Sequence, residues 1–177
     1  MSQPHPTAIA RPSADEYAPF YAGYVARVPD GDVVATLAAQ IATTHDLLAA
    51  VGEQRGNHRY APGKWSVKEV AGHMADTERI MVYRALRFAR GDETPLAGFD
   101  ENAYMPPSGF GERALASVLA ELEAVRAGTV AFFAGLPDAA WARGGRANDK
   151  YVTVRGLAWI VAGHERHHLD IIRERYL

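Results

Sequence analysis

Cysteine is absent from this chain of 177 residues. Its absence excludes disulfide bonds, thiolate metal ligands and a cysteine nucleophile. Any metal site must therefore be built from nitrogen and oxygen ligands. Because disulfides belong to oxidising compartments, a chain without cysteine is expected in the cytoplasm.

Long apolar runs and a strong net charge are also missing. No run approaches the roughly 20 apolar residues that span a bilayer, and the N-terminus lacks the apolar segment of a secretory signal. The formal net charge of −2 gives no electrostatic reason to expect binding to nucleic acid or to an anionic membrane. We expect residues 1–177 to form a single domain, since this length buries a full hydrophobic core.

Four amphipathic segments dominate the sequence. Apolar residues recur at helical spacing over residues 33–51, 66–90, 112–134 and 153–176. Ser66 and Glu69 form a capping-box pattern at the start of the second segment. The stretch ARGGRANDK reads as a loop, and YVTV is too short to predict a sheet. The pattern predicts an all-α four-helix bundle.

The N-terminal part and one linker complete this layout. Residues 1–12 contain three prolines and are expected to form an extended arm. Ser13 and Glu16 form a second capping-box pattern, which predicts a short helix. The aromatic residues of that helix either contribute to a homodimer or pack on the chain's own bundle, the interpretation we favour: Tyr17, Phe20, Tyr21 and Tyr24. The linker between the second and third helices has about twenty residues, a length typical of a crossover or of a segment that covers a site.

Histidine is concentrated in the last helix, where GHERHH holds three of the seven histidines. At about 100° per residue, His164 and His168 straddle the centre of the apolar face, whereas His167 lies on its shoulder. The same geometry places His73 on the apolar side of the second helix. An inward H-x-x-x-H pair either forms hydrogen bonds across the bundle or chelates a metal. A third inward imidazole favours the metal.

The remaining histidines and the polar neighbours of the cluster carry weaker predictions. We expect no metal role for His5, His45 or His58. Trp65 either anchors the start of its helix or contacts substrate. Acidic residues near the three histidines either orient a ligand or lie on solvated helix faces, the interpretation we favour: Asp76, Glu78, Glu165 and Asp170. Most arginines of the second helix are expected to be solvated or paired with nearby carboxylates, although one could meet an acidic cosubstrate: Arg79, Arg84, Arg87 and Arg90.

Two motifs, KWSVKEVAGHMAD and the terminal GHERHH, resemble the DinB/YfiT-like family of damage-inducible metalloproteins. The resemblance covers nearly the whole chain. It implies an up-down-down-up four-helix bundle with a long crossover between helices 2 and 3, and often a homodimer. It also implies a divalent metal held by His73, His164 and His168, the same residues that the helical geometry selects. The metal is expected to be zinc or nickel, with iron and manganese as alternatives.

We consider three functional hypotheses, of which the resemblance implies the first. The first is a metal-dependent transferase that joins a bacterial low-molecular-weight thiol to an electrophile in detoxification or stress response. The second is a metal-dependent hydrolase, which needs a general base that the sequence does not clearly provide. The third is a metal-binding stress protein without enzymatic activity. A metal favours the first two because it lowers the pKa of a bound thiol or water.

Overall fold

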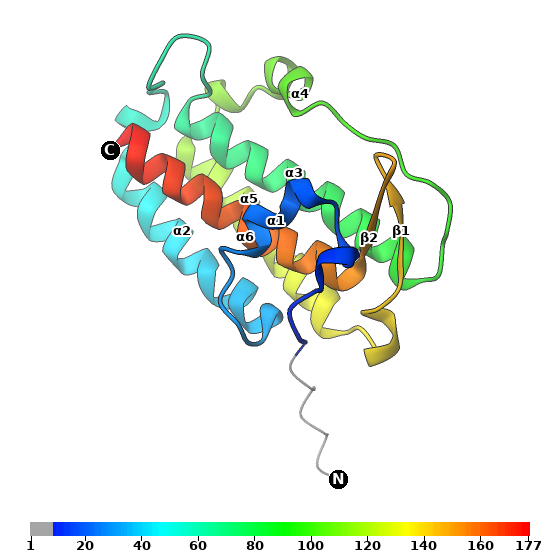
Figure 1. The fold of residues 1–177 in the computed structure, drawn as a ribbon. Helices are drawn as coiled ribbons and strands as arrows, with labels where there is room; N and C mark the ends of the chain where they lie inside the picture. Colours follow the sequence, from blue (N-terminus) through cyan, green and yellow to red (C-terminus); the bar gives the residue numbers. More distant parts are fainter. Residues whose placement is uncertain (1–8) are drawn as a thin grey trace.

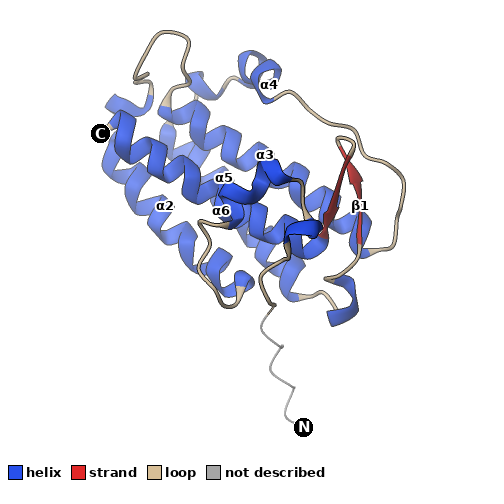
Figure 2. Ribbon diagram, viewed as in Figure 1, coloured by secondary structure: helices blue, strands red, loops and turns tan. Residues whose placement is uncertain are grey.

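The computed structural model describes residues 9–177, so His5 and most of the predicted arm lie outside the described residues. Four long helices form the body of the molecule: α2 (Val33–Gly56), α3 (Val67–Ala89), α5 (Leu115–Ala134) and α6 (Val154–Ile171) (Figures 1 and 2). The predicted all-α four-helix bundle is confirmed.

Contacts at one end of the bundle fix the helix directions. Glu53, near the end of α2, pairs with Lys68 at the start of α3 and accepts a hydrogen bond of 2.6 Å from the backbone N–H of Leu115, where α5 begins. Arg55 of α2 donates to the carbonyl of Tyr176, beyond the end of α6. Thus α3 and α5 both run opposite to α2, and α6 runs along it. This is the predicted up-down-down-up order.

The helices begin where the sequence provides side-chain caps. Asp32 accepts a hydrogen bond of 2.8 Å from the N–H of Val34, and Thr153 accepts one of 2.9 Å from the N–H of Gly156. The capping box of Ser66 and Glu69 is present at the start of α3. These contacts satisfy backbone donors that have no partner within the helix.

Several predicted boundaries differ from the structure. α2 continues to Gly56 across a kink at Gly52, where φ is 71°. α5 begins three residues later than expected, because residues 110–112 form a separate 3-10 turn. α6 ends at Ile171, and a π-helical turn, Ile172–Tyr176, follows it.

The expectation that ARGGRANDK is a loop was wrong. Strands β1 (Gly144–Ala147) and β2 (Lys150–Thr153) form an antiparallel hairpin, and β2 includes most of YVTV. Asn148 and Asp149 have φ values of 51° and 59°, as a tight hairpin turn requires. The linker pairs with this hairpin: the N–H of Leu96 donates to the carbonyl of Arg146 at 2.9 Å. The linker is therefore a strap fixed to the body, and it also contains an unpredicted short helix, α4 (Glu101–Ser108).

The core consists of two apolar halves separated by a polar layer. One half is rich in aromatic residues such as Phe88 and Trp159, and the other holds aliphatic residues such as Leu48 and Leu122. Each long helix contributes buried polar residues to this layer: Gln40, Thr44, His73, Thr77, Glu78, Arg126, Thr129, His164, Glu165 and His168. A layer of this kind is costly unless its members pair with one another or bind a ligand.

One helix of the described chain, α2, is long and apolar enough to cross a membrane by length and composition. It packs against α5 and α6 along the bundle. By itself, one such helix is weak evidence for a membrane span.

Candidate metal centre

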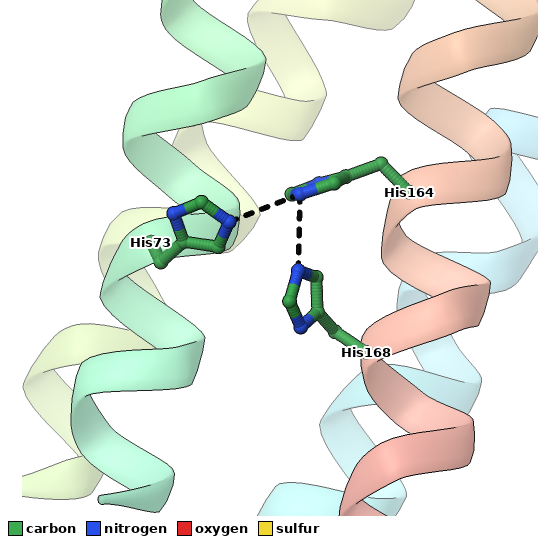
Figure 3. Close-up of side chains that lie close together, drawn as sticks. All are labelled: His73, His164 and His168. Atoms are coloured by element: carbon green, nitrogen blue, oxygen red, sulfur yellow. Dashed lines mark hydrogen bonds between the residues drawn. The ribbon is translucent and has the colours of Figure 1, made fainter. Parts of the chain in front are cut away.

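The structure brings His73, His164 and His168 together between α3 and α6 (Figure 3). The Nε2 atom of His164 lies 3.0 Å from the Nε2 atoms of both His73 and His168. Ligand-capable atoms of all three rings lie within 4.8 Å of one another, and all three residues are buried. We call these three residues the histidine cluster.

Glycines next to two of the histidines let other segments approach closely. A Cβ atom on Gly163, which precedes His164, would lie 2.0 Å from the carbonyl oxygen of Tyr24. A Cβ atom on Gly72, which precedes His73, would lie 2.3 Å from the ring of Phe110. The glycines allow helix α1 (Ala22–Val25) to cross α6 and the turn at residues 110–112 to cover α3. His73 and His164 therefore lie on stretches of helix against which other segments pack closely.

Burial keeps the cluster neutral near neutral pH. Burial lowers the pKa of His73 to about 4. It also lowers the pKa values of His164 and His168 well below the usual value, and the charges of neighbouring histidines lower them further. Neutral imidazole is the form that binds a metal ion.

The spacing of the nitrogens fits a divalent metal ion. Nitrogens of a tetrahedral site with metal–nitrogen distances of about 2.0–2.1 Å lie about 3.3 Å apart. The two Nε2 separations of 3.0 Å are close to this value, so small side-chain movements suffice. A neutral imidazole nitrogen either donates or accepts a hydrogen bond, so hydrogen bonds join the converging nitrogens only in pairs, whereas one metal ion can bind a nitrogen of all three rings. The residues therefore fit a three-histidine metal site.

Further contacts orient His73. The Nδ1 atom of His73 lies 3.4 Å from the hydroxyl oxygen of Thr77, on the side of the ring away from the cluster. The ring of Trp65 packs against it, with centroids 4.7 Å apart. The Tyr176 hydroxyl in turn donates a hydrogen bond of 2.6 Å to the carbonyl of Trp65. Trp65 thus anchors the start of α3 and also supports His73. Contacts of this kind orient metal-binding histidines in other proteins.

A cavity of about 210 Å³ opens beside the cluster, and we call it the aromatic cavity. Its walls include Tyr24, whose ring meets that of His164 edge-on at 5.5 Å. The other lining residues come from the N-terminal segment, α3, the linker, the hairpin turn and α6: Phe20, Tyr21, His73, Thr77, Met81, Arg84, Phe99, Glu101, Asn148 and His164. Sequence reasoning named neither Glu101 nor Asn148 as a site residue, because the fold brings them here on the linker and on the hairpin turn.

The expectation that Glu78 and Glu165 lie on solvated faces was wrong. Both are buried and both pair with Arg126 of α5. Arg126 donates to Glu78 at 2.9 and 2.8 Å, and its nitrogen lies 2.7 Å from a carboxylate oxygen of Glu165. Burial opposes the charge of Arg126, but the two carboxylates outweigh it and raise its pKa. Neither glutamate belongs to the histidine cluster, and their ion pairs with Arg126 join α3 and α6 to α5.

The other predicted residues lie outside the cluster. His167 is half-buried and packs on Tyr24, with ring centroids 5.3 Å apart, as its wheel position predicts. His45 is exposed and pairs with Glu123, and His58 contacts Tyr176. The remaining polar residues form local ion pairs or face solvent: Asp76, Arg79, Arg87, Arg90 and Asp170. Of the predicted aromatic segment, Tyr17, Tyr21 and Tyr24 pack on the core, whereas Phe20 is 79% exposed.

Comparisons with known proteins agree with this architecture. The structure is similar to that of YfiT from Bacillus subtilis, described as a probable metal-dependent hydrolase with an unusual four-helix bundle topology. The TM-score is 0.72 with 22% sequence identity, over 80% of this chain and 82% of that one. No curated protein matches the sequence. The sequence profile of the DinB superfamily matches residues 36–172. This chain is therefore a member of the DinB superfamily.

Proposed function

We propose that this protein is a metal-dependent transferase that joins a low-molecular-weight thiol to an electrophile. One observation carries the proposal: three neutral, buried imidazoles converge beside a cavity of about 210 Å³. A divalent ion held there would lower the pKa of a coordinated thiol and favour its thiolate. The three imidazoles carry no charge, so an anionic ligand would balance that of the ion.

The chain's own residues supply binding and orientation. His73, His164 and His168 would hold the ion, and we propose zinc or nickel, with iron or manganese as alternatives. Tyr24 and Phe99 give the cavity apolar walls suited to an organic substrate. Because the chain has no cysteine, the thiol must come from a cosubstrate.

Hydrolysis is the second candidate, and Glu101 favours it. Its carboxylate lines the aromatic cavity and is solvent-exposed, so it could accept a proton from water. In this candidate function Glu101 would be the general base that the sequence did not clearly provide. The activity in the description of YfiT is also hydrolytic. A third candidate is a metal-binding stress protein without enzymatic activity.

The cellular setting is part of the same proposal. We place the protein in the cytoplasm, in stress response or detoxification, since low-molecular-weight thiols act there. We further propose a homodimer, on the family resemblance alone. Sedimentation equilibrium at micromolar concentration should give twice the chain mass of 19.3 kDa, and a species of only that mass would contradict the dimer.

Activity assays on metal-loaded protein separate the candidates. The protein is incubated with an electrophile such as a bimane halide, with and without small bacterial thiols, and in parallel with ester substrates. We expect a thioether product that needs both thiol and metal, and loss of that product in His164→Ala. The exposed His45→Ala variant is the matched control and should retain activity. Metal-dependent ester cleavage without thiol transfer would instead support the hydrolase, and neither reaction would support the non-enzymatic protein.

A further inference from the structure

Arg84 of α3 is a buried arginine that makes no ion pair among residues 9–177. Only 4% of its surface is exposed. The other deeply buried arginine, Arg126, is 2% exposed and meets two carboxylates. Removing a cation from water is costly unless a partner compensates it. Arg126 has that compensation within the chain and Arg84 does not.

The hydrogen bonds of Arg84 leave part of its guanidinium unused. One nitrogen donates to the carbonyl of Ala97 at 2.9 Å, and another lies 3.6 Å from the sulfur of Met81, a weak acceptor. The ring of Phe99 lies 5.8 Å from the guanidinium carbon. A guanidinium has five N–H donors, so donors remain for a further acceptor. Burial lowers the pKa of Arg84, and the Tyr21 hydroxyl opposes this effect through its charge and through a hydrogen bond that takes up one more donor. An arginine nevertheless stays charged at neutral pH, and donors still remain among the five.

Arg84, which has these unused donors, lines the aromatic cavity. His73 and His164 of the histidine cluster line the same cavity. Met81, which the Arg84 guanidinium contacts, follows His73 by eight residues, or about 12 Å of helix axis. A single elongated molecule can therefore meet the histidine cluster at one end and Arg84 at the other. Aromatic and apolar side chains make up much of the remaining lining of the cavity.

We propose that Arg84 binds a carboxylate on the substrate that occupies the aromatic cavity, and so selects anionic substrates with the reacting atom at the opposite end. A guanidinium pairs with a carboxylate through two parallel hydrogen bonds, which gives both affinity and orientation. The inference deepens the proposed function and rests on it for the chemistry at the cluster. The binding of an anion by Arg84 itself can be tested without that chemistry.

The competing occupant is Glu101, the one carboxylate among the lining residues of the aromatic cavity. Its side chain makes no ion pair with Arg84 in the described structure, and it lies close enough to Tyr24 to affect the pKa of that hydroxyl. If Glu101 were to satisfy Arg84 in solution, its removal would expose the anion site. A Glu101→Gln variant therefore belongs in the experiment.

The first part of the experiment uses metal-free protein and a pair of probes of equal shape, hexanoate and hexanamide. Calorimetric titration should show hexanoate binding about tenfold or more tightly, the effect of one charge-assisted contact. Arg84→Met should abolish this preference, and Arg84→Lys should keep part of it. Arg87→Met is the matched control, because Arg87 pairs with Asp92 outside the aromatic cavity and its loss should leave the preference unchanged.

The second part uses cobalt-loaded protein with mercaptohexanoate and mercaptohexanamide. Both thiols should give a sulfur-to-cobalt absorption band, and the carboxylate should bind about tenfold more tightly only where Arg84 is present. If neither thiol gives the band while hexanoate is still preferred, the thiol chemistry fails and the Arg84 site stands. Equal binding of hexanoate and hexanamide to the unmodified protein would overturn the inference. So would a preference that survives Arg84→Met, or one that appears only in Glu101→Gln.

Discussion

Replacing Arg126 with methionine should destabilise the protein strongly. The substitution keeps much of the side-chain volume but removes a guanidinium that meets Glu78 at 2.9 and 2.8 Å and Glu165 at 2.7 Å. All three residues are at most 4% exposed, so two carboxylates would remain buried without a cation. Breaking a buried ion pair from one side costs about 3–5 kcal/mol. We expect a loss of at least that size in the free energy of unfolding.

Urea denaturation followed by far-ultraviolet circular dichroism measures this loss. A triple variant, Arg126→Met with Glu78→Gln and Glu165→Gln, should recover much of it, because the uncompensated charges are gone. Arg79→Met is the matched control: its ion pairs with Asp76 and Glu121 involve a side chain that is 45% exposed, and its loss should cost less than about 1 kcal/mol. A loss below about 1 kcal/mol in Arg126→Met, or a triple variant as unstable as the single one, would refute the reasoning.

Three further predictions concern packing, acid sensitivity and support of the cluster. Gly163→Ala should destabilise the protein by about 1–3 kcal/mol in thermal unfolding, because the new Cβ atom would lie 2.0 Å from the backbone of α1. Gly128→Ala should instead stabilise it by about 0.5–1 kcal/mol, because a Cβ atom at that position would meet nothing within 4 Å. Burial lowers the pKa of His73 to about 4, below its unfolded value near 6.5, so the unfolded chain binds more protons between these values. The metal-free protein should therefore lose stability as pH falls from about 6.5 to about 4, and an unchanged midpoint of unfolding over that interval would contradict the burial of the cluster. Tyr176→Phe removes the hydrogen bond to the Trp65 carbonyl and should cost about 0.5–1.5 kcal/mol, with a shift in tryptophan fluorescence as the test.

The bundle and the histidine cluster were predictable because both depend on local periodicity. A helix repeats every 3.6 residues, so the sequence alone shows which side chains share the apolar face. His164 and His168 were selected in this way, and His73 was selected on another helix by the same rule. Capping boxes are also local, which is why the start of α3 at Ser66 was predicted correctly.

The features that sequence reasoning missed depend on partners far along the chain. Glu78 looked solvated because its cation, Arg126, lies 48 residues away on α5. The hairpin was missed because the glycine-rich strand β1 has no strand pattern of its own and is held by pairing with β2 and with Leu96. Helix α4 includes two prolines, which usually argue against a helix. Glu101 reaches the aromatic cavity only because the strap is fixed to the hairpin.

The central claim is that the histidine cluster is a metal site, and metal content tests it most directly. The protein and four single variants, His73→Ala, His164→Ala, His168→Ala and His167→Ala, are purified in parallel and measured by elemental analysis. We predict one divalent ion per chain in the unmodified protein and in His167→Ala, because His167 packs on Tyr24 outside the cluster. The other three variants should lose most of the metal, since two imidazoles make a poor site for a divalent ion. Full metal content in any of these three, or equal loss in His167→Ala, would contradict the account.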